Sequence, residues 1–161
     1  MEVYILRHGI AEKTRAGGSD AERALTEKGR EKLRQVLRLA RSAAVHPSLI
    51  LTSPLVRAVQ TAEVAAEIFS YRREVVRTDA LLPTASPQEV WQDLRSHKNE
   101  PELLLVGHEP LLSQTVSHLL GAPSLRVELK KAGLVRMTID RFGPQPCGVL
   151  KWLLAPKVAL L

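Results

Sequence analysis

The sequence predicts a three-layer α/β/α sandwich with a mainly parallel sheet and an antiparallel edge. The first observation is that short apolar runs, typical of buried strands, alternate with helical patterns along the chain. The second is that the last two predicted strands are joined by the turn-rich residues 143–146, which favours an antiparallel pair. The third is a length of 161 residues without repeat or linker, so we expect residues 1–161 to form one domain.

The first third of the chain is predicted to form a strand, a long helix and a second strand. Residues 3–6 are a buried strand. Thr26 is the expected N-cap of the helix, because its side-chain oxygen can accept a hydrogen bond from a free amide of the first turn. Pro47 closes this segment, and residues 49–51 form the second buried strand. One helix face carries an apolar stripe: Leu33, Val36, Leu37, Ala40 and Ala44.

Two serine–proline pairs mark the next helix starts. Ser53 is the expected N-cap of a helix that has Pro54 at its first position and runs to about residue 69. Residues 74–77 form a third, weaker strand. A second helix opens at residues 86–87 and continues through the apolar positions of residues 90–94.

The last third supplies three more predicted strands. Residues 103–106 form a strongly buried strand, and a helix follows from about residue 110 to residue 120. Residues 134–139 and 149–154 are the late pair that forms the antiparallel edge.

Composition excludes several classes of protein. Hydrophobic residues make up 45% and charged residues 25%, which is typical of a folded globular protein. Cys147 is the single cysteine, so an internal disulfide is excluded and a reducing, cytoplasmic setting is expected. No apolar run approaches the roughly 20 residues of a membrane span. The first residues show neither a basic region nor an apolar leader, so we expect no signal peptide and no membrane partner.

The chain carries a formal charge of +6, from 23 lysines and arginines against 17 acids. Such an excess favours anionic partners in general, and it does not choose among phosphate esters, acidic proteins, nucleic acids and membrane surfaces. Aromatic residues are only 4%, which leaves little material for stacking on single-stranded bases.

Polar side chains follow three of the buried strands at the point where each strand ends. Arg7 and His8 follow the first strand, Arg57 lies in the first turn after the second, and His108 follows the strand over residues 103–106. Ligands of parallel α/β sheets bind beyond the carboxyl ends of the strands, so these side chains are expected at one edge. Arginine forks and helix N-termini both favour a phosphoryl group there.

Taken one at a time, these residues have ordinary structural interpretations. His8 alone reads as a hydrogen-bonded structural histidine, Arg57 as a surface arginine of a helix, and His108 as a helix cap. The joint pattern changes this interpretation, because three separate strand ends deliver the same chemistry to one place. It favours a phosphate-binding catalytic site.

The sequence resembles the histidine phosphatase superfamily, and within it the SixA-type phosphohistidine phosphatases. Four segments in order carry most of the resemblance: an Arg-His-Gly signature, a Leu-Thr-x-x-Gly element, a Ser-Pro-x-x-Arg-Ala-x-Gln-Thr segment and a second histidine segment. A fifth, closing strand is similar to that of the subgroup. These segments are residues 6–9, 24–29, 53–61, 106–110 and 151–156.

The resemblance implies a mechanism and a set of roles. His8 is the expected nucleophile, forming a phosphohistidine intermediate, while Arg7, Arg57 and His108 bind the phosphoryl oxygens. Glu109 is a candidate general acid, with a helix N-terminal acid as its alternative interpretation. No metal or other cofactor is implied, since the five histidines show no ligand spacing.

The resemblance and the chain's small size together predict a protein substrate. A shallow, open pocket suits a phosphorylated histidine on a protein surface, such as that of a histidine phosphotransfer domain. An imidazole leaves a phosphoramidate more easily than an alkoxide leaves an ester. Faster turnover of phosphohistidine or aryl phosphates than of alkyl phosphates is therefore expected.

Three competing functions remain open from the sequence. A broad small-molecule phosphomonoesterase would use the same pocket, and a phosphoprotein-binding module would use it without turnover. A nucleic-acid-binding module would use a row of arginines at helical spacing, although Glu27 and Glu31 dilute its charge. That row consists of Arg30, Arg34, Arg38 and Arg41. We expect no nucleic acid partner, because no recognition motif is present and aromatic residues are few.

Overall fold

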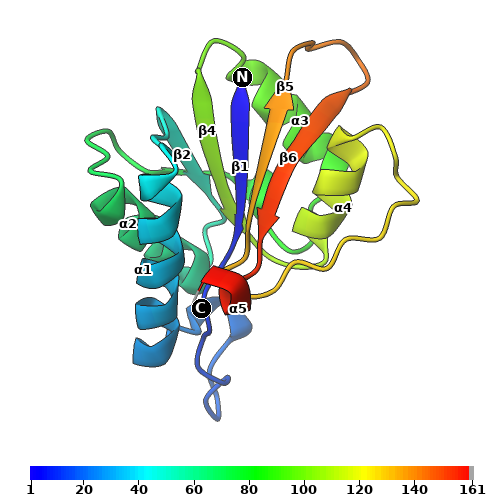
Figure 1. The fold of residues 1–161 in the computed structure, drawn as a ribbon. Helices are drawn as coiled ribbons and strands as arrows, with labels where there is room; N and C mark the ends of the chain where they lie inside the picture. Colours follow the sequence, from blue (N-terminus) through cyan, green and yellow to red (C-terminus); the bar gives the residue numbers. More distant parts are fainter. Residues whose placement is uncertain (160–161) are drawn as a thin grey trace.

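A computed structural model describes residues 1–159 and places them in a mixed, six-stranded sheet between two layers of helices (Figure 1). This arrangement confirms the predicted α/β sandwich. The strands are β1 (Glu2–Arg7), β2 (Leu49–Thr52), β3 (Val76–Arg77), β4 (Glu102–Gly107), β5 (Leu134–Ile139) and β6 (Gly148–Leu154).

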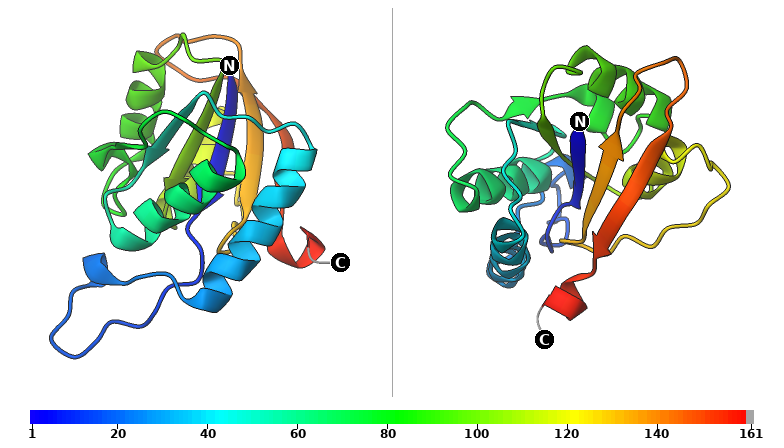
Figure 2. Two further views of the ribbon diagram at one scale, coloured as in Figure 1. Left: turned by 90° about the vertical axis from the view of Figure 1, so that its left-hand side faces the viewer. Right: turned by 45° about the horizontal axis from the view of Figure 1, so that its top comes forward.

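The helices cover both faces of the sheet. On one face α1 packs against α2, and on the other α3 packs against α4, as the two views of Figure 2 show. Among residues 1–159, no helix is both long and apolar enough to span a membrane. The helices are α1 (Glu27–Ser42), α2 (Val56–Ile68), α3 (Pro87–Ser96), α4 (Leu111–Leu119) and the short α5 (Pro156–Ala159), with 3₁₀ turns η1 (Asp20–Glu22) and η2 (Asp79–Leu81).

The sheet has the order β3-β2-β4-β1-β5-β6. β4 lies in its centre and pairs in parallel with β1 on one side and β2 on the other. Val106 of β4 is opposite Leu6 on one side and Thr52 on the other, so the three strands end almost level. β5 and β6 add the expected antiparallel edge.

Alternate residues of the central strands feed two separate cores. In β1, Tyr4 and Leu6 pack among the apolar residues of α1 and α2, while Val3 and Ile5 pack among those of α3 and α4. Because both faces of the sheet are buried, the sequences of the central strands are continuous apolar runs and do not alternate between apolar and polar residues. The helices and central strands therefore hold the strand ends rigidly in place.

The predicted start of the second helix is wrong. α2 begins at Val56 with Leu55 as its N-cap, rather than at Ser53 and Pro54. The physical reason is that Ser53 is engaged elsewhere: its amide donates to Val106 O at 2.9 Å, and its hydroxyl lies 2.7 Å from His108 Nε2. The other predicted elements are present, with the weak third strand reduced to Val76–Arg77. The long helix ends at Ser42, so Ala44, predicted on its apolar stripe, is an exposed residue beyond it with a φ of 61°.

The loop after β1 is fixed against the first turn of α1 by Gly29. The amide of Thr26 donates to Ile10 O at 2.9 Å, and the Thr26 side chain caps α1 by accepting from Gly29 N at 2.9 Å. A Cβ atom on Gly29 would lie 2.2 Å from that same Ile10 oxygen. The glycine of the Leu-Thr-x-x-Gly element is therefore required by a close approach between two backbones.

We predict that Gly29→Ala lowers the free energy of unfolding by about 1–3 kcal/mol, because the loop carrying Ile10 must move away from the added methyl group. Urea denaturation measures the loss directly. Gly143→Ala is the matched control, since the nearest atom to its added Cβ would lie 3.9 Å away. A loss in the control equal to that of Gly29→Ala would contradict this explanation.

Candidate active site

The carboxyl ends of β1, β2 and β4 bring together side chains from three distant parts of the chain. Two hydrogen bonds continue the sheet pairing past the strands: His8 N donates to Gly107 O at 3.0 Å, and Ser53 N donates to Val106 O at 2.9 Å. The rings of His8 and His108 consequently lie close, with centroids 5.1 Å apart. The site forms at the edge where the loop between β1 and α1 folds under the sheet (Figures 1 and 2).

The His8 ring is buried with one nitrogen already paired. His8 is only 6% exposed, and its Nδ1 lies 2.7 Å from the carbonyl oxygen of Gly9. A carbonyl oxygen can only accept, so in the neutral ring Nδ1 carries the hydrogen and Nε2 carries the free lone pair. The neighbouring glycine carbonyl thus selects the tautomer that a nucleophilic Nε2 requires.

Burial lowers the pKa of His8 to about 4. The hydrogen bond to Gly9 O opposes this shift, and the positive charges of Arg57 and Arg7 add to it. The imidazole is therefore neutral across the neutral pH range.

His108 is the second buried imidazole of the site. It is 2% exposed, and its Nε2 lies 2.7 Å from Ser53 Oγ. Its pKa is lowered to about 3 by burial first, and then by electrostatic coupling to the His8 ring and by the charge of Arg57. Nδ1 of this ring is buried and has no partner among residues 1–159.

The guanidinium groups of Arg7 and Arg57 are held by hydrogen bonds from their terminal nitrogens. Arg7 Nη1 donates to Leu129 O at 2.9 Å. Arg57, only 5% exposed, donates from Nη1 to the backbone oxygen of Asp20 at 2.8 Å and from Nη2 to the carboxylate at 3.0 Å. The Nε atom of each arginine is buried without a partner among residues 1–159.

Three buried nitrogens without a partner among residues 1–159 belong to side chains near the neutral His8 ring: Arg7 Nε, Arg57 Nε and His108 Nδ1. A buried polar group without a partner costs roughly 1–3 kcal/mol, so these three nitrogens favour a ligand that can pair with them. The complementary ligand is an anion with several acceptor oxygens. We call the set of Arg7, His8, Arg57 and His108 the oxyanion cradle. The four side chains predicted from the sequence thus lie together.

Two residues that sequence reasoning missed hold the cradle in place. Thr61 accepts a hydrogen bond from Gly9 N at 3.1 Å and donates to Arg57 O at 2.7 Å, which ties the loop after β1 to α2. Ser53, which the sequence predicts as a helix N-cap, instead contacts His108. Both belong to the Ser-Pro-x-x-Arg-Ala-x-Gln-Thr segment, so membership of that segment is the sequence feature that could have indicated their role at the site.

Asp20 is a third residue that the sequence did not single out. Its carboxylate binds Arg57 through Oδ2 and Arg23 through Oδ1, the latter at 2.9 Å. Hydrogen bonds from Arg23 and from Arg57 hold the pKa of Asp20 below its ordinary value. Asp20 therefore binds both terminal nitrogens of Arg57, while Nε has no partner among residues 1–159.

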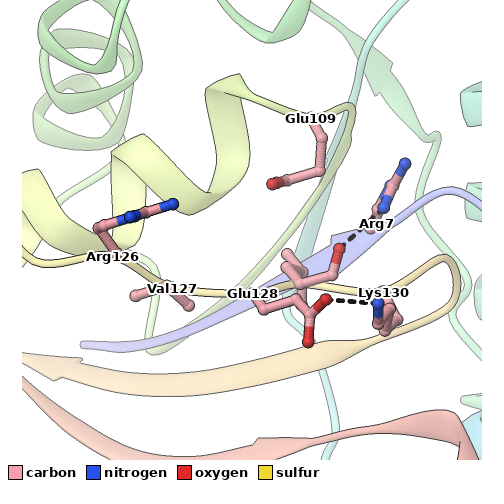
Figure 3. Close-up of a pocket in the computed structure, with 7 residues that line it drawn as sticks. Arg7, Glu109, Arg126, Val127, Glu128 and Lys130 are labelled. Carbon is pink, nitrogen blue, oxygen red and sulfur yellow. Dashed lines mark hydrogen bonds and ion pairs between the residues drawn. The ribbon is translucent and has the colours of Figure 1, made fainter.

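Glu109 lies two residues before the start of α4 and lines a cavity together with Arg7. Its Oε1 accepts from Ser113 N at 2.9 Å, so the carboxylate binds a free amide of the first turn of α4 from just before the helix. The carboxylate also faces a cavity of about 510 Å³ that Arg7 and Arg126 help to line (Figure 3). Among residues 1–159, no three His, Cys, Asp or Glu side chains gather closely enough to hold a metal ion.

Comparison with known proteins identifies relatives in sequence and in structure. The model of the histidine phosphatase superfamily (branch 1) matches residues 3–82. An uncharacterized protein of Picosynechococcus sp. is 34% identical over 137 residues, which cover 84% of this chain and 83% of that protein. The phosphohistidine phosphatase SixA of Escherichia coli K12 is 27% identical over 158 residues, covering 97% and 94% of the two chains.

Solved structures show the same fold. The protein histidine phosphatase SixA complexed with tungstate has a TM-score of 0.88 at 25% identity, covering 98% of this chain and 99% of that one. A phosphoserine phosphatase mutant from Entamoeba histolytica has a TM-score of 0.72 at 16% identity, covering 99% of each chain, which shows a shared fold alone. The chain therefore belongs to the histidine phosphatase superfamily, and this membership implies phosphatase activity.

We predict that acid destabilises the protein through its buried imidazoles. An unfolded histidine has a pKa near 6.5, whereas His8 has a pKa of about 4 in the folded state. The unfolded state therefore binds more protons between these values, so this stability is present above pH 6.5 and is lost as the pH falls toward 4. For His8 the loss from pH 7 to pH 5 is on the order of 1–2 kcal/mol.

Urea denaturation at pH 7 and pH 5 checks this expectation. The His8→Asn variant lacks the titrating ring, so its stability should fall less between the two pH values than that of the wild type. Equal losses in the two proteins would contradict a neutral, buried His8.

Proposed function

We propose that this chain is a phosphohistidine phosphatase, which transfers the phosphoryl group of a protein phosphohistidine to His8 and then to water. The observation that carries the proposal is a free Nε2 lone pair on a buried, neutral His8, near three buried nitrogens that have no partner among residues 1–159. The similarity to SixA phosphohistidine phosphatase supports it, as does a related structure complexed with tungstate, a tetrahedral oxyanion like phosphate.

The proposed reaction has two displacements at phosphorus. In the first, His8 Nε2 attacks in line, a new P–N bond forms, and the bond to the substrate imidazole breaks. The leaving imidazole takes its proton from solvent. In the second, water attacks the phosphorylated His8, releases inorganic phosphate and restores the free ring. The hydrogen bond from His8 Nδ1 to Gly9 O keeps the attacking nitrogen oriented in both steps.

The other cradle residues stabilise the transferring group. Arg7 and Arg57 donate to its oxygens from Nε, where charge is spread over three equatorial atoms. His108 donates from Nδ1, which requires the hydrogen on that nitrogen. Ser53 Oγ lies 2.7 Å from His108 Nε2, and a hydroxyl that donates to Nε2 supports this tautomer. Ser53 is therefore a positioning residue in the proposed mechanism.

The proposed substrate is a phosphorylated protein such as a histidine phosphotransfer domain, and the proposed role is to end phosphohistidine signalling in the cytoplasm. Cys147 is a free, exposed thiol, which suits a reducing compartment. A small-molecule phosphomonoesterase would use the same cradle, so the substrate experiments below compare the two functions directly.

We predict that the enzyme forms a covalent phosphoenzyme that depends on His8. Incubation with a ³²P-labelled phosphohistidine protein, followed by quenching in base, should leave label on the wild type and none on His8→Asn. Phosphate release by the variant should fall at least about 10³-fold, because the nucleophile is gone.

Labelling that survives in His8→Asn would assign the nucleophile elsewhere. Binding of the phosphoprotein without release of phosphate would show a binding module rather than an enzyme. His46→Asn is the matched control, because His46 is exposed and lies outside the cradle, and it should behave like the wild type.

We also predict that Glu109 acts as a helix N-terminal acid and not as the proton donor. Glu109→Gln keeps an oxygen for Ser113 N, so kcat/KM should change less than about threefold on phosphohistidine, on an aryl phosphate and on glycerol phosphate. The wild type should hydrolyse the first two faster than the third.

The same panel gives the contrary outcomes. A loss of 10²-fold or more confined to glycerol phosphate would make Glu109 the general acid for alkoxide leaving groups. Comparable wild-type rates on glycerol phosphate and phosphohistidine would favour the phosphomonoesterase.

A further inference from the structure

A second cavity opens beside the cradle, on the side of α5. It has a volume of about 730 Å³ and lies between the first turns of α1, the segment before β5 and the corner between β6 and α5. Figure 1 shows α5 beside α1 at the lower edge of the sheet. Its apolar surface comes from Ile10, Ala155, Pro156 and Val158. We call this cavity the lysine groove, after the charged residues that surround it.

The charge of the lysine groove is strongly one-sided. Five cations and one acid line it: Arg7, Lys32, Lys130, Lys131, Lys157 and Glu128. Glu128 contacts Lys130, as the dashed line in Figure 3 marks. Lys32, Lys131 and Lys157 take part in none of the ion pairs formed within residues 1–159.

The neighbouring cavity of about 510 Å³ lacks this bias. Three cations line it together with two acids, Glu109 and Glu128. The two cavities share Arg7, so an occupant of the phosphate site has both within reach. Of the two cavities, the lysine groove has the larger excess of positive charge, which an acidic partner would balance.

The lysine groove is also tied directly to the nucleophile. Ala132 N lies within hydrogen-bonding distance of Arg7 O and His8 O, at 3.1 and 3.2 Å, so the segment carrying Lys130 and Lys131 is fixed against the end of β1. The positive charge of Lys131 reaches His8 and contributes to lowering its pKa. The groove therefore lies within reach of a substrate that holds its phosphoryl group in the cradle.

We propose that the lysine groove binds an acidic segment of the phosphoprotein substrate next to its phosphohistidine, with an apolar side chain on the groove floor. This inference rests on the proposed function and adds the surface that selects the substrate. Carboxylates of the segment pair with Lys32 and Lys157. No aromatic side chain lines the groove, so it offers stacked bases no platform, and a protein segment fits it better than a nucleic acid.

The test compares two phosphohistidine peptides that differ only in their flanking residues. One carries Asp and Glu together with a leucine, and the other carries Asn and Gln at the acidic positions. The enzyme variant is Lys32→Gln/Lys157→Gln, which removes two charges of the groove and none of the cradle. The matched control, Lys98→Gln/Lys151→Gln, removes two exposed lysines that do not line the groove. Free phosphohistidine is the substrate without any flanking segment.

In the wild type, KM should be about fivefold or more lower for the acidic peptide than for the neutral one, and the difference should shrink as salt is raised. Lys32→Gln/Lys157→Gln should lose most of this difference with kcat unchanged, and its turnover of free phosphohistidine should equal that of the wild type. The control variant should behave like the wild type on all three substrates.

Equal KM values for the two peptides in the wild type would overturn the docking proposal, and so would an equal effect of the control variant. Binding to anionic phospholipid vesicles that needs Lys32 and Lys157, with no preference between peptides, would overturn it in favour of a membrane surface. Wild-type protein that turns over neither peptide nor free phosphohistidine would refute the proposed function itself. That outcome is distinct from normal turnover without discrimination.

Discussion

The site depends on one constraint, the parallel pairing of β4 with β1 on one side and β2 on the other. The three strands end almost level, so the residues that follow them meet although the chain separates them widely. Hydrogen bonds from His8 to Gly107 and from Ser53 to Val106 extend this pairing by one residue. Because helices bury both sheet faces, the strand ends have little freedom to drift, and the geometry of the site follows from the core.

Within this frame, burial controls the charge of the two imidazoles. Water is excluded from His8 and His108, so the neutral form of each ring is favoured, and the adjacent arginines add to the effect. The Nε atoms of Arg7 and Arg57 are also buried, and they have no partner among residues 1–159. Because a buried donor without a partner is unfavourable, an anion that accepts from them is bound favourably. One physical condition therefore gives the proposed nucleophile its free lone pair and the proposed phosphate site its affinity.

A surrounding set of contacts turns this edge into a defined site. Asp20 braces the terminal nitrogens of Arg57, Thr61 joins the loop after β1 to α2, and Ser53 holds one nitrogen of His108. None of these residues needs to touch the phosphoryl group, and each limits how a neighbouring side chain can turn. The lysine groove extends the positive surface beyond the cradle, to where the acidic segment of the substrate is proposed to bind.

The sequence by itself determined the strand and helix order and the four cradle residues, because apolar runs and short motifs are local properties of the chain. The Thr26 cap was predictable for the same reason. Only the tertiary structure decided that Ser53 contacts His108 instead of capping α2, and that Asp20 pairs with Arg57. These choices depend on which distant group competes for a donor or an acceptor, and that competition exists only after the strands have paired.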